Sequence, residues 1–317
     1  MANPEFNVPT KSFGVAKNTW ISLKTHLQSI NKHAEADITI ATIPVEREAA
    51  QALGIMQIDE DLRIRRFVEK PKDPAVLESL RLPQASYPKL GIEGQEEFFL
   101  ASMGIYVFNR DVLFELLDNN FTDFGKHIIP TAIDTHRVHS FVFQGYWEDI
   151  GTIRSFFDAN LDLAAELPRF DFFDMSAPIF TRPRFLPASK INGASIDHAI
   201  ISDGCIINHC KISHCIVGVR CLVDAGSHIT RTIMLGSDSF ESEASIEQNA
   251  ILKRPRIGIG QNTRIDCAIV DKNARIGNNC VISPAGKPES FDHPLCFIRD
   301  GIVVIPKNTI IPDGTII

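Results

Sequence analysis

An acidic and a basic residue stand next to each other in Phe67-Val-Glu-Lys-Pro71, where a proline ends a predicted strand. Side chains alternate between the two faces of a strand, so we expect Glu69 and Lys70 on opposite faces, with one able to reach a pocket at the carboxyl edge of a sheet. A lysine there can hold a phosphate as a point charge. The alternative interpretation is a solvated strand end without a ligand.

Two adjacent carboxylates, Glu148 and Asp149, follow two aromatic residues in Gly145-Tyr-Trp-Glu-Asp-Ile-Gly-Thr152. The segment is typical of a strand-to-helix turn, in which Gly151 allows an unusual backbone angle. A carboxylate in such a turn can bind Mg²⁺, which takes one or two acidic ligands together with substrate phosphates. The alternative is that Asp149 caps a helix beginning at Gly151 or Thr152.

The cysteines all lie in the C-terminal half, at Cys205, Cys210, Cys215, Cys221, Cys267, Cys280 and Cys296. Their odd number, without a CxxC pair, argues against a disulfide framework or a zinc site. We interpret them as small hydrophobic residues inside a repeat, with a metal site as the alternative.

Composition excludes several classes of protein. The chain has 317 residues, 44% of them hydrophobic, and a formal net charge of −7, so it has length for two cores and no basic excess for nucleic acid or acidic membranes. Residues 1–17 lack the apolar core of a signal peptide, and no apolar run approaches the roughly 20 residues of a membrane span. We therefore expect a cytoplasmic protein.

The elements that position Lys70 and Asp149 alternate between strands and helices. The patterns predict strands at 36–45, 54–58, 64–71, 98–108 (interrupted by Gly104) and 138–144, and helices at 21–32, 111–117 and 148–167, with a helix and loop over 72–97. Such alternation favours an α/β sheet domain.

The pattern changes from about Phe185. Aliphatic residues then recur every five or six positions in three runs: Ile196, Ile201, Ile207, Ile212, Val217 and Leu222; Ile259, Ile265, Val270, Ile276 and Ile282; Val304, Ile310 and Ile316. This period fits a hexapeptide solenoid, in which each triangular coil places one aliphatic side chain inside per face. The sequence therefore predicts a parallel β-helix, preceded by a Pro/Phe-rich linker.

Several motifs resemble those of ADP-glucose pyrophosphorylases, which are glucose-1-phosphate adenylyltransferases. They occur in the family's order: ADITIATIPV (36–45), LGIMQID (53–59), FVEKPKDP (67–74), ASMGIYVF (101–108), DFGKHIIP (123–130), GYWEDIGT (145–152), SAPIFTRPRFLPASK (176–190) and GIVVIPKNTIIPDGTII (301–317). The combination of YWEDIGT with SAPIFTRPRFLP is the most specific to this branch. The resemblance implies a partial Rossmann-like nucleotidyltransferase sheet domain followed by a left-handed parallel β-helix.

The resemblance also implies roles for individual residues. Lys70 would pair with the phosphate of glucose 1-phosphate, and Glu69 would bind the sugar hydroxyls. Ser102, Glu148 and the backbone at Gly54 would complete the substrate contacts. Asp149 would share Mg²⁺ with a second aspartate. The implied reaction converts ATP and glucose 1-phosphate into ADP-glucose and pyrophosphate, through in-line attack without a covalent intermediate.

The chain departs from the family pattern at its start. The glycine-rich GGxGTRLxPLT loop that holds ATP is missing, as is the Ser-Gly-Asp that supplies the partner aspartate. We therefore expect residues 1–20 to be unrelated or disordered, residues 21–167 to form a truncated, partial catalytic domain, 168–187 a linker, and 188–317 a regulatory and oligomerisation β-helix. The family implies a tetramer, and Lys307, with Arg254 and Arg256, is a candidate for effector binding.

Three hypotheses follow. The chain is a member of the enzyme family that is inactive alone for want of an ATP site; or it is a non-catalytic regulatory or scaffolding subunit, or a degraded gene product. A hexapeptide-repeat acyltransferase is the third, because the solenoid offers four histidines as bases: His198, His209, His214 and His228. It would leave the upstream motifs without a purpose.

Overall fold

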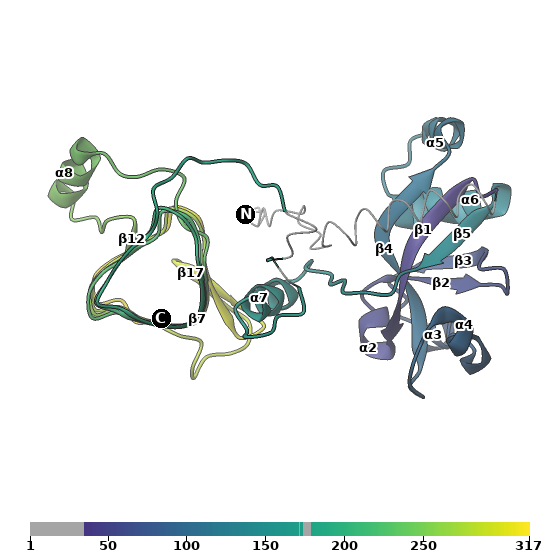
Figure 1. Ribbon diagram of the computed structural model, residues 1–317, viewed down its shortest axis with the longest axis horizontal. Helices are drawn as coiled ribbons and strands as arrows, with labels where there is room; N and C mark the ends of the chain where they lie inside the picture. Colours follow the sequence, from purple (N-terminus) through teal and green to yellow (C-terminus); the bar gives the residue numbers. More distant parts are fainter. Residues whose placement is uncertain (1–34, 171, 174–178) are drawn as a thin grey trace. The chain divides into compact units, whose positions relative to one another are not determined.

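The computed structural model describes residues 35–170, 172–173 and 179–317, which fall into two compact units (Figure 1). The sheet unit comprises the described residues up to Trp147, together with Ile179, and the solenoid unit comprises Glu148–Phe173 and Phe180–Ile317. The segment 1–20, the helix predicted at 21–32 and part of the predicted linker lie outside the described residues. Each unit is described by itself.

The sheet unit contains a five-stranded mixed sheet with the order β3-β2-β4-β1-β5. Only the β1–β5 pair is parallel, whereas β1–β4, β2–β4 and β2–β3 are antiparallel. The strands are β1 (Ile38–Glu46), β2 (Gly54–Ile58), β3 (Ile64–Glu69), β4 (Phe98–Phe108) and β5 (Val138–Val142). All five predicted strands are thus present, with ends that differ by up to two residues.

Short helices cover both faces of this sheet (Figure 1). One core joins Ile40, Met56 and Phe67 to Leu116 and Ile129, and a second joins Ile55 and Phe99 to Leu77. The helices are α2 (Arg47–Ala50), α3 (Pro74–Ser79), the 3₁₀ turn η1 (Gln84–Ser86), α4 (Tyr87–Leu90), α5 (Arg110–Leu117), the π-helical turn η2 (Phe124–Ile128) and α6 (Ile129–Thr135). The helices η2 and α6 were not predicted, because their buried face consists of only three residues: Ile128, Ile129 and Ala132.

The solenoid unit begins with α7 (Ile153–Asp162). Ile153, Phe156 and Phe157 pack against Ile233 and Ile269 of the solenoid, so this helix belongs to the solenoid unit rather than to the sheet domain. The compact units divide at Glu148, so the helix predicted over 148–167 lies in the solenoid unit. The predicted apolar stripe was right, but a stripe by itself does not say which core it covers.

The rest of the unit is a parallel β-helix, as predicted. Its strands form a six-stranded parallel sheet with the order β19-β14-β12-β10-β8-β6 and an eight-stranded sheet with the order β16-β17-β18-β13-β11-β9-β7. The first sheet contains β6 (Lys190–Asn192), β8 (Ile206–Asn208), β10 (Leu222–Val223), β12 (Gly258–Ile259), β14 (Arg275–Ile276) and β19 (Ile310–Ile311). The second contains β7 (Ser195–Ile201), β9 (Lys211–Val217), β11 (His228–Met234), β13 (Arg264–Val270), β16 (Phe291–His293), β17 (Cys296–Arg299) and β18 (Ile302–Ile305), with β15 (Val281–Ile282) paired to β13.

In-register stacking of one aliphatic residue per coil builds the solenoid core. The inward row of the six-stranded sheet is Ile207, Val223, Ile259, Ile276 and Ile311. Leu222, Val304, Ile310 and Ile316 were predicted inside but do not face this interior. Each has an aliphatic neighbour on the chain that takes the inward position instead, and spacing alone does not choose between two adjacent aliphatic residues.

The seven cysteines are all buried and none is in a disulfide. Six lie in the solenoid core, and Cys267 packs in the cluster beneath α7. Burial raises the pKa of the Cys210 and Cys215 thiols to about 11, which keeps them protonated at neutral pH. The prediction that cysteines serve here as small core residues is confirmed.

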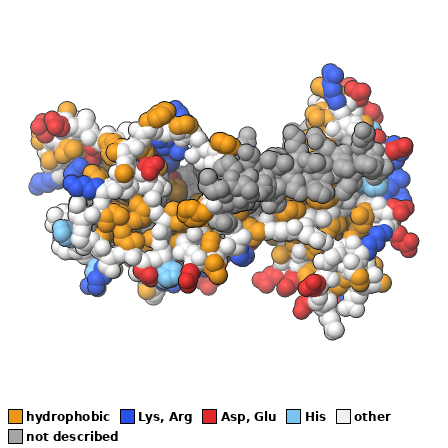
Figure 2. Space-filling model, in the orientation of Figure 1, with side chains coloured by type: hydrophobic (Ala, Val, Ile, Leu, Met, Phe, Trp, Pro, Cys, Tyr) orange, Lys and Arg blue, Asp and Glu red, His pale blue; other side chains and the backbone are white. Residues whose placement is uncertain are grey.

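The first coil of the solenoid is less covered than the following coils. Ile191 is 47% exposed, although its register partner Ile207 is fully buried. Figure 2 shows hydrophobic side chains gathered at the triangular end of the solenoid seen in that view.

None of the helices in the described ranges has the length and hydrophobicity that a bilayer span requires.

Candidate functional site

The Glu69 carboxylate lies between two glycines in the sheet unit. Glu69 ends β3 and pairs in register with Gly54, the first residue of β2. A Cβ atom added at Gly54 would come within 2.8 Å of Glu69 Oε2, and one added at Gly125 would come equally close. Both glycines therefore leave the space that this carboxylate fills.

A bulge in β4 brings two hydroxyl groups toward the same place. Ile40 pairs with Tyr106 while Thr42 pairs with Ser102, so β4 has two extra residues between these positions. Gly104 takes a left-handed backbone there, with φ of 71°. The Ser102 hydroxyl accepts a hydrogen bond from the Gly104 N–H and lies 3.5 Å from the Tyr106 hydroxyl. The interruption predicted at Gly104 is thus a bulge within one continuous strand.

Electrostatic coupling links Tyr106 to two carboxylates. Burial, reinforced by the negative charges of Glu69 and Asp123, raises the pKa of the Tyr106 phenol. Asp123 caps η2 by accepting a hydrogen bond from the Lys126 N–H at 2.8 Å, which lowers the pKa of its carboxyl group. We define the hydroxyl–carboxylate cluster as Glu69, Ser102, Tyr106 and Asp123.

Lys70 lies outside β3, just beyond Glu69. Its φ of 49° is left-handed, and its backbone N–H donates to the Leu53 carbonyl at 3.0 Å. β3 therefore ends one residue before Lys70, and the strand alternation used to predict its direction does not extend to this residue. Lys70 is exposed, and its ammonium group makes no ion pair with any described residue, which leaves it available to an anion.

Three residues near Glu69 were not predicted as site residues: Tyr106, Asp123 and Gly125. They do lie in two of the family motifs, ASMGIYVF and DFGKHIIP, which could have identified them. Spacing did not show that those motifs meet the FVEKP strand end. Of the predicted residues in this unit, the structure groups Gly54, Glu69 and Ser102, with Lys70 next to them along the chain.

Glu148 and Asp149 belong to the solenoid unit and are therefore described separately. Thr152, rather than Asp149, caps α7, through a capping box with Ser155. The alternative interpretation, in which Asp149 caps the helix, is therefore wrong: Asp149 instead accepts a hydrogen bond from the Gly151 N–H at 3.0 Å. Glu148 lies 3.6 Å from the Arg169 guanidinium.

The residues around Asp149 suit a metal ion only in part. No group of three or more acidic, histidine or cysteine side chains among the described residues is arranged to hold a metal ion. Asp149 is exposed, its Oδ1 atom accepts a hydrogen bond from the Gly151 N–H, and its Oδ2 atom forms no bond with any described residue. This arrangement suits a single carboxylate ligand for a Mg²⁺ that also binds substrate phosphates, rather than a cage made of protein.

The three candidate effector residues do not converge. The Lys307 ammonium pairs with Asp238 at 2.8 Å, and together with Asn273 it lowers the pKa of that carboxyl to about 2. Arg256 lies 3.9 Å from Glu241, and Arg254 forms no ion pair among the described residues. Both arginines border a groove on the six-stranded sheet.

The four histidines proposed as acyltransferase bases lie on the solenoid surface. The rings of His198 and His214 stack in parallel with centroids 4.8 Å apart, and His198 contacts Asp197 at 2.9 Å. His209 lies against Gly193 in the preceding coil, and His228 is exposed in β11. None of the four lines the groove, so the structure gives no support to the acyltransferase hypothesis.

The phenol of Tyr106 is expected to ionise at a higher pH than an ordinary tyrosine, whose pKa is about 10. Between pH 10 and the raised folded-state pKa, the unfolded chain binds fewer protons than the folded chain, so the free energy of unfolding falls as pH rises. Ultraviolet titration of the phenolate measures the shift, since the chain has only three tyrosines. Loss of the late-titrating phenol in Tyr106→Phe assigns it, and a normal titration of all three would contradict the prediction.

Comparisons with known proteins cover nearly the whole chain. A family model described as nucleotidyl transferase matches residues 11–166, beginning inside the first twenty residues. A model described as the GLGC left-handed parallel beta-helix domain matches residues 184–316. A large subunit of glucose-1-phosphate adenylyltransferase from Zea mays, named chloroplastic/amyloplastic, is 42% identical over 300 residues, or 92% of this chain. The match spans 58% of that relative's length.

Proposed function

The chain belongs to the glucose-1-phosphate adenylyltransferase family, and from that premise we propose that it binds glucose 1-phosphate at the end of β3. The observation that carries the proposal is the hydroxyl–carboxylate cluster beside an unpaired lysine. A sugar phosphate needs acceptors and donors for its hydroxyl groups and a cation for its phosphate. Glu69, Ser102 and Lys70 supply these, and all three lie in the sheet unit.

We propose that each side chain has a distinct part in the reaction of ATP with glucose 1-phosphate. Lys70 binds the phosphate whose oxygen attacks the α-phosphorus, and Glu69 orients the sugar through its hydroxyl groups. Asp149, in the solenoid unit, is proposed as one carboxylate ligand of a Mg²⁺ ion, which would supply positive charge for phosphoryl transfer. Pyrophosphate leaves as the new oxygen–phosphorus bond forms.

A tetrameric assembly is proposed on family grounds alone.

The substitution Lys70→Gln is expected to weaken glucose 1-phosphate binding at least about tenfold, because a hydrogen bond to a charged group contributes roughly 1.5–3 kcal/mol. Isothermal titration calorimetry measures the affinity. Lys72→Gln is the matched control, since it removes the same charge from an exposed residue two positions away. Equal affinities for wild type and Lys70→Gln would reject this site.

A non-catalytic subunit is the second candidate, since the relative that is 42% identical is itself named a large subunit. On this proposal the chain binds glucose 1-phosphate but forms no ADP-glucose by itself. The calorimetry sample is then assayed for pyrophosphate release after ATP and Mg²⁺ are added. Steady turnover would favour the enzyme, whereas binding without turnover would favour the subunit.

A further inference from the structure

A groove of about 530 Å³ lies on the outer face of the six-stranded sheet, within the solenoid unit. One wall is the segment Lys253–Ile257, which returns the chain to β12 after an insertion that begins at Gly236. This insertion carries the helix α8 (Glu243–Ile251). The groove involves none of the residues proposed to bind glucose 1-phosphate.

A buried ion pair fixes that wall. The side chain of Glu241 is 3% exposed and accepts hydrogen bonds from Arg275 Nη1 at 2.7 Å, the Ile257 N–H at 2.9 Å and Asn249 Nδ2 at 3.1 Å. The same Arg275 nitrogen donates to the Pro255 carbonyl at 2.8 Å. Because Arg275 belongs to β14 of the sheet itself, the wall and floor are held together and the groove is preformed.

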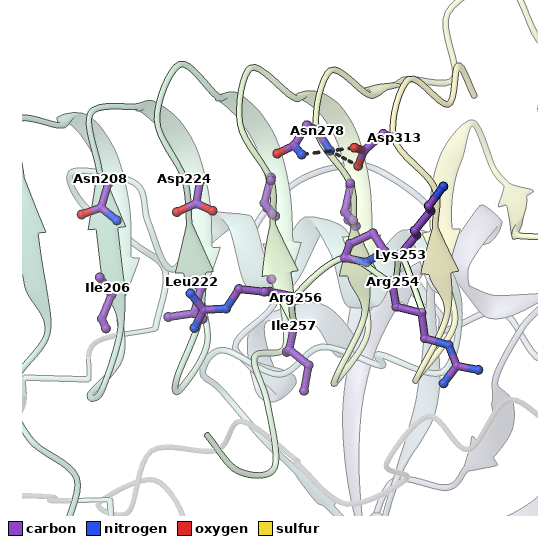
Figure 3. Close-up of a pocket in the computed structure, with 16 residues that line it drawn as sticks. Ile206, Asn208, Leu222, Asp224, Lys253, Arg254, Arg256, Ile257, Asn278 and Asp313 are labelled. Carbon is purple, nitrogen blue, oxygen red and sulfur yellow. Dashed lines mark hydrogen bonds between the residues drawn. The ribbon is translucent and has the colours of Figure 1, made fainter. Parts of the chain in front are cut away.

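Two different rows of side chains run along the floor from coil to coil. Ile206 and Leu222 are register partners on the outer face, and they form an apolar row. Asn208 and Asp224 follow them two residues later in the same coils and form a polar row beside it, as Figure 3 shows. Both rows repeat at the spacing between coils, about 4.8 Å. Further along, Gly260 and Gly277 add no side chain to fill the floor.

Asn208 and Asp224 of the polar row can each form further hydrogen bonds. Asn192 Nδ2 donates to Asn208 Oδ1 at 2.7 Å, which leaves the amide group of Asn208 as a donor. The Asp224 carboxylate makes no hydrogen bond or ion pair with any residue in the described ranges, so it is an open acceptor. Adjacent coils therefore offer a donor and an acceptor side by side.

The charges around the groove nearly balance. Asp224 and Asp313 lie on one side in Figure 3, and the side chain of Arg256 extends over the groove from the other side. Lys253 and Arg254 extend away from the apolar row in the same view. The two carboxylates would repel an anion, and Arg256 would repel a cation. The lining therefore suits a neutral ligand.

We propose that this groove binds a linear neutral oligosaccharide, lying along the solenoid axis. A sugar ring has an apolar C–H face for Ile206 and Leu222, and an edge of hydroxyl groups that both donate and accept for Asn208, Asp224 and Arg256. Each ring is about as long as the coil spacing, so two successive rings would meet equivalent side chains: Ile206 and Asn208 in one coil, Leu222 and Asp224 in the next. Planar amide, carboxylate and guanidinium groups can each bond two neighbouring hydroxyl groups.

The test uses the full chain, labelled at isoleucine and leucine methyl groups, with maltoheptaose as the probe. Binding is expected to shift the methyl resonances of Ile206 and Leu222. Asp224→Ala is expected to weaken that binding at least about tenfold. Asp224→Asn keeps an acceptor and is expected to retain more of the affinity. Asp203→Ala is the matched control, because Asp203 is exposed and outside the groove, and its carboxylate forms no bond with any residue that the structure describes.

Three results would overturn the proposal. One is the absence of methyl shifts up to the solubility limit of maltoheptaose. The second is an unchanged affinity in Asp224→Ala with intact methyl spectra. The third is displacement of the sugar from these methyl groups by inorganic phosphate, which would identify an anion site instead. Glucose 1-phosphate binding, measured by calorimetry on the same sample, tests the proposed function separately and does not depend on any of these three results.

Discussion

Replacement of Gly125 by alanine is expected to weaken glucose 1-phosphate binding at least about tenfold while leaving thermal stability nearly unchanged. The three atoms nearest to the new Cβ atom would all belong to side chains: Glu69 Oε2 at 2.8 Å, Glu69 Cδ at 3.3 Å and Asp123 Oδ1 at 3.6 Å. A carboxylate at the end of a flexible side chain can move aside at little energetic cost. The movement takes Glu69 away from the position proposed to bind sugar hydroxyl groups.

Gly54→Ala provides the contrast. Its Cβ atom would meet the same carboxylate oxygen and would also come within 2.5 Å of Phe67 Cζ, an atom of the core. Overpacking there is expected to cost about 1–3 kcal/mol of stability in addition to the loss of binding. Calorimetry and thermal melting measure both variants. Normal affinity in a well-folded Gly125→Ala variant would mean that Glu69 does not contact the sugar.

Glu241→Ala is expected to lower the free energy of unfolding of the solenoid unit by about 3–5 kcal/mol. The change leaves the Arg275 guanidinium, which is 16% exposed, without its carboxylate, and it also removes the acceptor for the Ile257 N–H. Both losses fall on the wall of the groove. Chemical denaturation of the purified chain measures the change.

Glu247→Ala is the control for this effect, since Glu247 lies on α8 but is exposed and forms no ion pair in the described ranges. Its stability is expected to stay within about 0.5 kcal/mol of wild type. The double variant Glu241→Gln with Arg275→Met should recover part of the loss, because no unpaired buried charge remains. Equal stabilities for Glu241→Ala and Glu247→Ala would show that the ion pair does not hold the insertion.

Much of the architecture could be predicted from local patterns. β-branched runs located the strands of the sheet unit, and the five- to six-residue period identified the β-helix, because these patterns reflect the faces that each element must bury. The same reasoning located α7 but did not show which core it covers. Its apolar stripe required a partner surface, and only packing on Ile233 and Ile269 shows that the partner is the solenoid.

The candidate site was predictable only in part. Glu69 and Lys70 stood out as a charged pair before a proline, but their directions depended on where β3 ends. The left-handed backbone at Lys70 takes it out of the strand pattern. Ser102 and Tyr106 are brought together by a bulge that holds two extra residues. Gly104 marks an interruption in the sequence, but it gives no sign of the register on either side of the bulge.

The sequence by itself determined the types of element, the solenoid repeat and the motifs that identify the family, since each depends on residues close together along the chain. The tertiary structure decided that Gly125 and Gly54 share one carboxylate, that Thr152 rather than Asp149 caps α7, and that Leu222 faces outward beside Asp224. Each of these depends on register and on contacts between distant segments. Such contacts are set by the packing of whole elements, which local spacing does not encode.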